Sequence, residues 1–100
     1  MTLQDFLVKV HDRSINHEHL SRAWREMMIH NLAYDNLSAE NKNYIIDLIF
    51  NHREKLFHNI HLSQSEIDHE YYRVWEKRKT LGLLENDLEN IKEVLHSFKA

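Results

Sequence analysis

The segment LSQSEIDHEYYRVWEKRK, residues 62–79, contains the clearest helix start in the chain. Ser63 can accept a hydrogen bond as an N-cap residue, and Glu66, three positions later, can complete a capping box. Leu62 and Ile67 flank this box in the positions of a hydrophobic staple. These signals predict a helix that begins directly after Ser63.

Glycine and proline are almost absent from the rest of the chain. Gly82 is the only glycine among the 100 residues, and there is no proline. Because tight β-hairpin turns usually need residues that tolerate positive φ, this composition disfavours a β-rich fold and predicts an all-α protein. Gly82 itself is placed to end or bend the helix that starts after Ser63.

Apolar residues recur at helical spacing in four further segments. They predict helices over about residues 3–13, 16–34, 38–60 and 84–98, with Thr2 and Asn16 as the N-caps of the first two. Together with the helix after residue 63, these segments predict a compact bundle of four to five short helices.

The third predicted helix, with Asp35 or Ser38 as its N-cap, is apolar on two sides. One apolar stripe begins at Ile45 and the second at Ile46. A helix that is apolar on two sides is buried on both, so we expect this helix to be the central one. No linker or repeat divides the chain, which predicts a single domain over residues 1–100.

The charge and the cysteine content exclude several classes of protein. The net charge of −3 is spread over both halves of the chain, so no basic arm is present and nucleic acid is a disfavoured partner. The absence of cysteine excludes disulfides, thiolate metal sites and a cysteine nucleophile. The longest apolar run is interrupted by Asp47 and is shorter than the roughly 20 residues of a membrane span. We therefore expect a cytoplasmic protein.

The sequence has no catalytic motif that would indicate an enzyme or a cofactor. It contains no Gly-x-Ser-x-Gly and no glycine-rich phosphate loop. The spacings Arg25-x4-His30 and Arg53-x4-His58 resemble the Arg-x4-His motif of HEPN-type ribonucleases, which are small helical proteins. Glutamate follows each arginine, where that family carries Asn, Asp or His, so the chain is not assigned to it.

Two Glu-x-x-His pairs, Glu66/His69 and Glu93/His96, resemble the ligand pairs of di-iron four-helix bundles. At about 100° per residue, His69 and Glu93 lie opposite the apolar stripes of their helices, so both pairs are expected to face water. His52, in contrast, falls on an apolar stripe, and we expect it to be a core-edge histidine with one hydrogen bond. A histidine and glutamate metal-binding bundle remains the first alternative function.

A helical nucleic-acid-binding domain that uses Arg73, Lys77 and Lys79 is the second alternative. Glutamates are interleaved with these basic residues, which predicts a surface of mixed sign. Tyr71 and Trp75 are expected to point into the core rather than to stack on bases.

The second predicted helix is apolar on both sides, which indicates more apolar surface than a small bundle can bury. The residues predicted to form an interaction surface there are Trp24, Met28, Ile29, Leu32, Ala33 and Tyr34. The competing interpretation is that this helix is simply an inner element of the bundle.

The preferred prediction is a small non-enzymatic module that binds another protein and also itself. It would act as an adaptor, regulator or inhibitor, a class that includes phage and mobile-element products.

Overall fold

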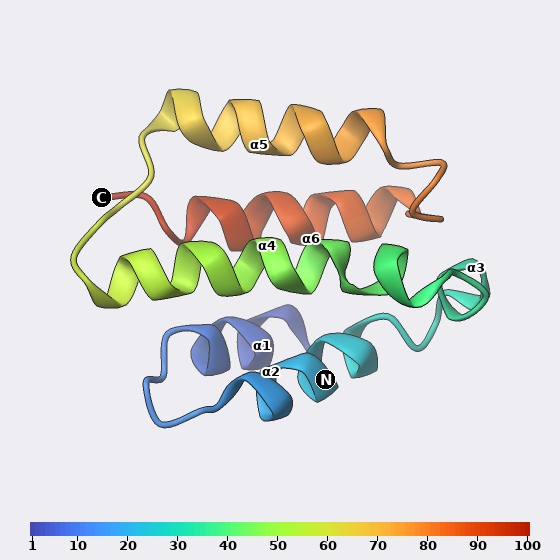
Figure 1. Ribbon diagram of the computed structural model, residues 1–100, viewed down its shortest axis with the longest axis horizontal. Helices are drawn as coiled ribbons and strands as arrows, with labels where there is room; N and C mark the ends of the chain where they lie inside the picture. The colour runs from blue at the N-terminus through green and yellow to red at the C-terminus, as the bar shows by residue number, and fades with distance from the viewer.

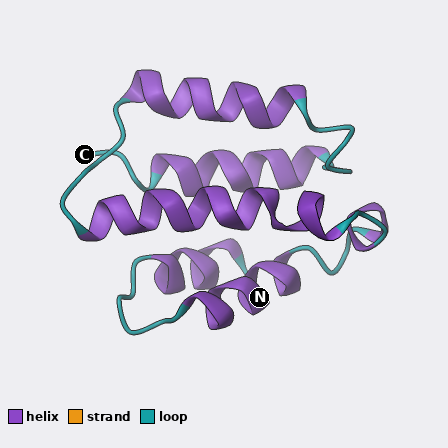
Figure 2. Cartoon of the chain, viewed as in Figure 1, coloured by secondary structure: helices purple, strands orange, loops and turns teal.

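Six helices joined by short turns make up the computed structural model, which describes all of residues 1–100 (Figures 1 and 2). The helices are α1 (Leu3–Val10), α2 (His17–Met27), α3 (Leu32–Asp35), α4 (Ala39–Phe57), α5 (Gln64–Glu76) and α6 (Glu85–His96). The chain forms no strand, so the predicted all-α class is confirmed. None of these helices combines the length and the apolar character that crossing a membrane requires.

The longest helix, α4, occupies the middle of the bundle. In Figure 1 it lies between the α1–α2 pair on one side and α5 on the other, with α6 beside it. α1 packs on α2, α2 packs on α4, and α5 packs on α6, which runs antiparallel to it. This is the central position expected for a helix with two apolar stripes.

Four helices begin where the sequence predicts an N-cap. The side chains of Thr2, Asn16, Ser38 and Ser63 each accept a hydrogen bond from the backbone N–H three residues further along. Thr2 and Ser63 belong to complete capping boxes, and Ser38 rather than Asp35 caps α4. The local chemistry of the sequence therefore determines these helix starts.

The predicted helix over residues 16–34 is interrupted, and this prediction was wrong. α2 ends at Met27, and the new helix α3 starts after Asn31. The side-chain oxygen of Asn31 accepts from the backbone N–H of Tyr34 at 3.1 Å. Its amide donates to the backbone oxygen of Gly82 at 2.7 Å and to the carboxylate of Asp87 at 2.8 Å. These distant partners stabilise a bend where local periodicity alone predicts a continuous helix.

The fifth helix also ends earlier than the sequence predicts. α5 stops at Glu76, and turns follow as far as Gly82, which has a φ of 61°. A side chain at Gly82 would be strained at this φ, and its Cβ would lie 3.2 Å from the Cβ of Ala33. The glycine therefore reverses the chain and lets it approach α3 closely.

One cluster of twenty buried apolar side chains forms the core, in which the rings of Phe6 and Trp24 lie 5.6 Å apart. Arg53 is the buried cation beside this core. Its Nε donates to the backbone oxygen of Val10 at 2.8 Å, and its Nη2 donates to those of Asp12 and Ile15, both at 2.6 Å. Arg53 thus joins α4 to the end of α1 and to the loop that follows, a structural role unlike that of a ribonuclease arginine.

Candidate interaction surfaces

Three of the six residues predicted to form an interaction surface belong to the core. Trp24, Met28 and Tyr34 are only 1%, 2% and 4% exposed. The hydroxyl of Tyr34 donates to the backbone oxygen of Lys42 at 2.6 Å, which joins α3 to the first turns of α4. These three side chains support the bend between α2 and α3 and are not available to a partner in the folded protein.

The other three predicted residues are exposed and form what we call the bend patch: Ile29, Leu32 and Ala33. Ile29 is 76% exposed and Leu32 is 75% exposed, the highest values among the large apolar side chains of the chain. Single exposed apolar residues are common, but two at one bend leave an apolar surface without intramolecular cover.

A buried carboxylate holds the bend patch in place. Asp87, whose side chain is inaccessible, accepts hydrogen bonds from the amide of Asn31 and from the backbone N–H of Leu84, at 2.8 and 2.9 Å. Its Oδ1 lies 2.8 Å from Nε2 of His30. Two adjacent residues of the bend, His30 and Asn31, are therefore fixed to the start of α6, so the patch is presented by a rigid backbone.

A second exposed surface runs along α5 and its C-terminal turn. Tyr72, Trp75 and Arg78 follow one another at intervals of three residues, and we call this group the aromatic ladder. The two rings are stacked with centroids 6.2 Å apart and an interplanar angle of 16°. The guanidinium of Arg78 lies 3.7 Å from the centroid of the Trp75 ring. Tyr72 is 57% exposed and Trp75 is 41% exposed.

The expectation that Trp75 points into the core was wrong. The buried side chains of α5 are Ile67 and Val74, and Tyr71 is only partly buried beside them. Trp75 follows Val74 by one residue, about 100° around the helix, which takes its indole to the edge of the buried face. Arg78 covers the ring there, so the indole is stabilised without entering the core.

A shallow pocket of about 370 Å³ adjoins the aromatic ladder. Its walls include Asp68, Tyr71 and Lys92 in addition to the two ladder rings. The ammonium of Lys92 lies 5.6 Å from the centroid of the Tyr71 ring. The surface thus combines aromatic area with one cation and one carboxylate, which can orient a partner.

The basic residues of α5 and of the turn that follows it do not form a continuous stripe. Arg73 lies 4.0 Å from the carboxylate of Glu70, and Lys77 lies over the Tyr44 ring at 5.3 Å. Of the three residues predicted for nucleic-acid binding, only Lys79 is exposed without such a contact. This arrangement has the mixed sign that the sequence predicted.

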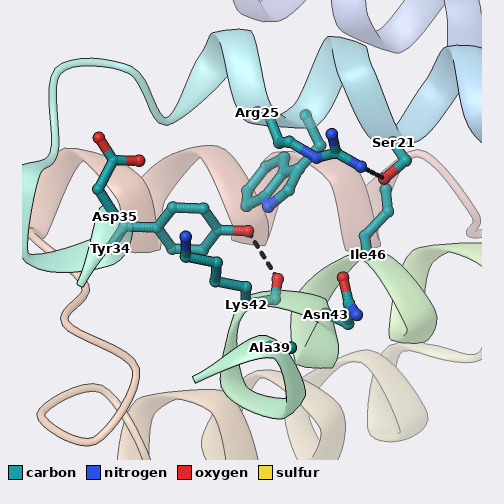
Figure 3. A pocket seen from close by; sticks show the side chains of 9 residues that line it. Ser21, Arg25, Tyr34, Asp35, Ala39, Lys42, Asn43 and Ile46 are labelled. Atoms are coloured by element: carbon teal, nitrogen blue, oxygen red, sulfur yellow. Dashed lines mark hydrogen bonds between the residues drawn. The ribbon is translucent and has the colours of Figure 1, made fainter. Parts of the chain in front are cut away.

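A polar pocket of about 300 Å³ lies between α2, α3 and the start of α4 (Figure 3). Arg25 and Lys42 line it together with Asp35, and Arg25 donates to the hydroxyl of Ser21 at 3.2 Å. Burial raises the pKa of the Tyr34 phenol, which also lines this pocket. The pocket has groups of both signs, and the indole nitrogen of Trp24, which also lines it, is buried without a hydrogen-bond partner.

His52 differs from its predicted environment. It is 5% exposed as expected, but neither ring nitrogen has a hydrogen-bond partner, so the predicted single hydrogen bond is absent. The nearest charged group is Glu70, whose Oε2 lies 3.8 Å from Nε2 of His52. Burial lowers the pKa of His52, and the carboxylate of Glu70 opposes that shift. His52 opens onto a pocket of about 380 Å³ whose other walls include Glu66, His69 and Lys55.

The first Glu-x-x-His pair, Glu66/His69, is exposed as predicted, yet it borders the same pocket as His52. Helical periodicity placed the pair away from the apolar stripe but could not show which buried side chain lay next to it. In the present side-chain arrangement, no three histidine, aspartate or glutamate side chains are positioned to hold a metal ion.

No protein-family model, curated protein or solved structure matches this chain.

Proposed function

We propose that this protein is a non-enzymatic protein-binding module that acts as an adaptor, regulator or inhibitor of its partner. The observation that carries the proposal is the stacking of the exposed rings of Tyr72 and Trp75, with the half-buried Arg78 over the second ring. Tryptophan, tyrosine and arginine are the residues most enriched among those that dominate the binding energy of protein interfaces. Here they occupy one surface of a single helix and its C-terminal turn.

Pre-stacking makes this surface favourable for binding. When a partner immobilises a flexible side chain, the lost rotamer freedom costs about 0.5–1.5 kcal/mol of binding free energy for each side chain. The stacked rings and the guanidinium are already restrained, and Arg78 also donates to the backbone oxygen of Trp75 at 2.8 Å. The aromatic ladder therefore offers large contact area with little additional ordering.

The same geometry favours a protein partner over a nucleic acid. Nonspecific binding of single strands depends on open aromatic faces and on a positively charged groove. Tyr72 stacks on Trp75 and Arg78 lies over the same ring, so a base would have to displace one of them to stack on Trp75. The neighbouring cation Arg73 lies close to a glutamate.

The bend patch supports the second part of the proposal, self-association. Ile29 and Leu32 project from a backbone that the Asp87 network fixes, and the folded chain covers neither side chain. Contact between two copies through this patch would bury these side chains and would leave the aromatic ladder free for another protein.

Site-specific photocrosslinking tests the main contact. A photoreactive phenylalanine analogue is placed at Tyr72, and at Val8 as a control, in cells that normally make the protein. Val8 is an exposed apolar residue of α1 outside both surfaces. We expect one protein to be crosslinked from position 72 and not from position 8. The adduct should be lost when Trp75→Ala is added. Equal crosslinking from both positions, or an adduct that Trp75→Ala leaves unchanged, would contradict the proposal.

A further inference from the structure

We propose that the pocket between α4 and α5 binds a divalent transition-metal ion such as Zn²⁺ through His52, His69 and Glu70. This inference concerns a different part of the molecule from the aromatic ladder and the bend patch, and it does not depend on the protein-binding role. Three features of the pocket support the proposal. They are a buried imidazole without a hydrogen-bond partner, a carboxylate close to it, and a second histidine side chain that makes no hydrogen bond.

The first feature is the unsatisfied imidazole of His52. Buried polar side chains nearly always have a hydrogen-bond partner, and leaving one without a partner costs stability. His52 is 95% buried, and neither Nδ1 nor Nε2 has a partner. The ring of His52 borders a polar pocket, and a neutral imidazole nitrogen without a hydrogen-bond partner is able to bind a metal ion.

The second feature is the separation between this imidazole and Glu70. Nε2 of His52 lies 3.8 Å from Oε2 of Glu70, which is too long for a hydrogen bond. Two ligand atoms bound about 2.0–2.1 Å from a tetrahedral zinc ion are about 3.4 Å apart. A shift of roughly half an ångström would therefore allow an ion to bridge the two groups.

The third feature is the availability of His69. It precedes Glu70 on α5, lines the same pocket, is exposed and makes no hydrogen bond. Glu66 is less available, because its Oε1 accepts from the backbone N–H of Ser63 in the capping box. The ligands do not yet converge on one point, so binding requires a rotamer change of His69. Two histidines and one glutamate make up a known zinc ligand set.

The charge of the pocket also favours a cation. The carboxylates of Glu66 and Glu70 line it, against the single ammonium group of Lys55. The second Glu-x-x-His pair, Glu93/His96 on α6, has the same spacing as Glu66/His69, but neither of its residues lines this pocket. That pair provides a matched control within the same chain.

The experiment uses the untagged full chain, stripped with a chelator and exchanged into metal-free buffer. Co²⁺ is titrated as a spectroscopic probe, and Zn²⁺ is then added as a competitor. We expect one Co²⁺ per chain with visible absorption of a low-coordinate site, displaced by Zn²⁺. His69→Ala and Glu70→Gln should each weaken binding by about tenfold or more, as losses at metal sites commonly do. His96→Ala should bind as the parent does.

The variants avoid the buried His52, so failure to fold does not obscure the result. Absence of stoichiometric Co²⁺ binding would overturn the proposal. Binding that His69→Ala and Glu70→Gln leave unchanged, or that His96→Ala weakens equally, would also overturn it, because surface histidines would then hold the ion.

Discussion

The Oδ1 atom of Asp87 lies 2.8 Å from Nε2 of His30, and this contact joins the start of α6 to the bend that follows α2. The other carboxylate oxygen accepts from Asn31 and from the backbone of Leu84. A single buried carboxylate therefore determines where α2 ends and how α6 begins. It also determines the conformation of the backbone that carries the bend patch.

Replacing this carboxylate should destabilise the fold. Asp87→Asn removes the charge and places an amide donor next to the amide of Asn31. We expect the free energy of unfolding to fall by about 1.5–3 kcal/mol, the range for hydrogen bonds to a charged group. Urea denaturation followed by circular dichroism measures the change. Glu85→Gln, at an exposed position of the same helix turn, is the control and should change stability by less than about 0.5 kcal/mol. Equal effects of the two substitutions would contradict the role of Asp87.

Arg53 should not tolerate replacement by lysine. An ammonium group cannot reproduce the guanidinium that binds three backbone oxygens from two directions. We expect Arg53→Lys to lower the free energy of unfolding by about 2–4 kcal/mol, because buried carbonyl groups lose their donors. Arg22→Lys makes the same substitution at an exposed i,i+4 pair with Glu18 and should be nearly neutral. A nearly neutral Arg53→Lys in urea denaturation would show that other donors satisfy these carbonyl groups.

Substitutions in the bend patch should prevent self-association without unfolding the protein. Ile29→Asp and Leu32→Asp place a charge on exposed side chains, so we expect unchanged helix content and loss of self-association in native mass spectrometry. Met28→Asp places the same charge next to the patch but inside the core, and it should unfold the protein. Loss of helix content in the first two variants would instead show that Ile29 and Leu32 are needed for the fold.

Stability should fall in mild acid, in part through His11. Partial desolvation of the ring, which remains exposed on one side, and to a smaller extent the charge of Arg53 lower the pKa of His11 from the ordinary value of 6.5. The unfolded chain therefore binds the proton first, and stability decreases as the pH falls below about 6.5. We expect the melting temperature to drop between about pH 8 and pH 5. The drop should be smaller for His11→Asn. Identical pH profiles for the parent protein and for His11→Asn would show that His11 does not contribute to the loss of stability.

Local sequence signals were sufficient for four of the six helix starts. A cap at Thr2, Asn16, Ser38 or Ser63 involves residues only three positions apart, so it can be read without knowledge of the fold. The two apolar stripes of α4 likewise predicted its central position, because burial on both sides requires neighbours on both sides.

Features that depend on distant residues were not predictable in this way. The break before α3 requires Asn31 to meet Gly82 and Asp87, more than fifty positions away. The pocket beside His52 requires α5 to present Glu70 and His69 to α4. Trp75 lies at the edge of the buried face of α5, and helical periodicity does not resolve whether a side chain at such an edge is buried or exposed.

The hydrogen bonds that Arg53 makes to the α1–α2 loop affect whether a protease can cut the chain there. Exposed loops are usually where proteins are cut and where insertions are tolerated. Arg13 lies in this loop and is a trypsin site by sequence, but its guanidinium donates to the backbone oxygen of Phe57 at 2.8 Å. The carbonyl groups of Asp12 and Ile15 are held by Arg53 at the same time. Tryptic cleavage after Arg13 would therefore report the separation of the α1–α2 pair from α4, and not the mobility of the loop itself.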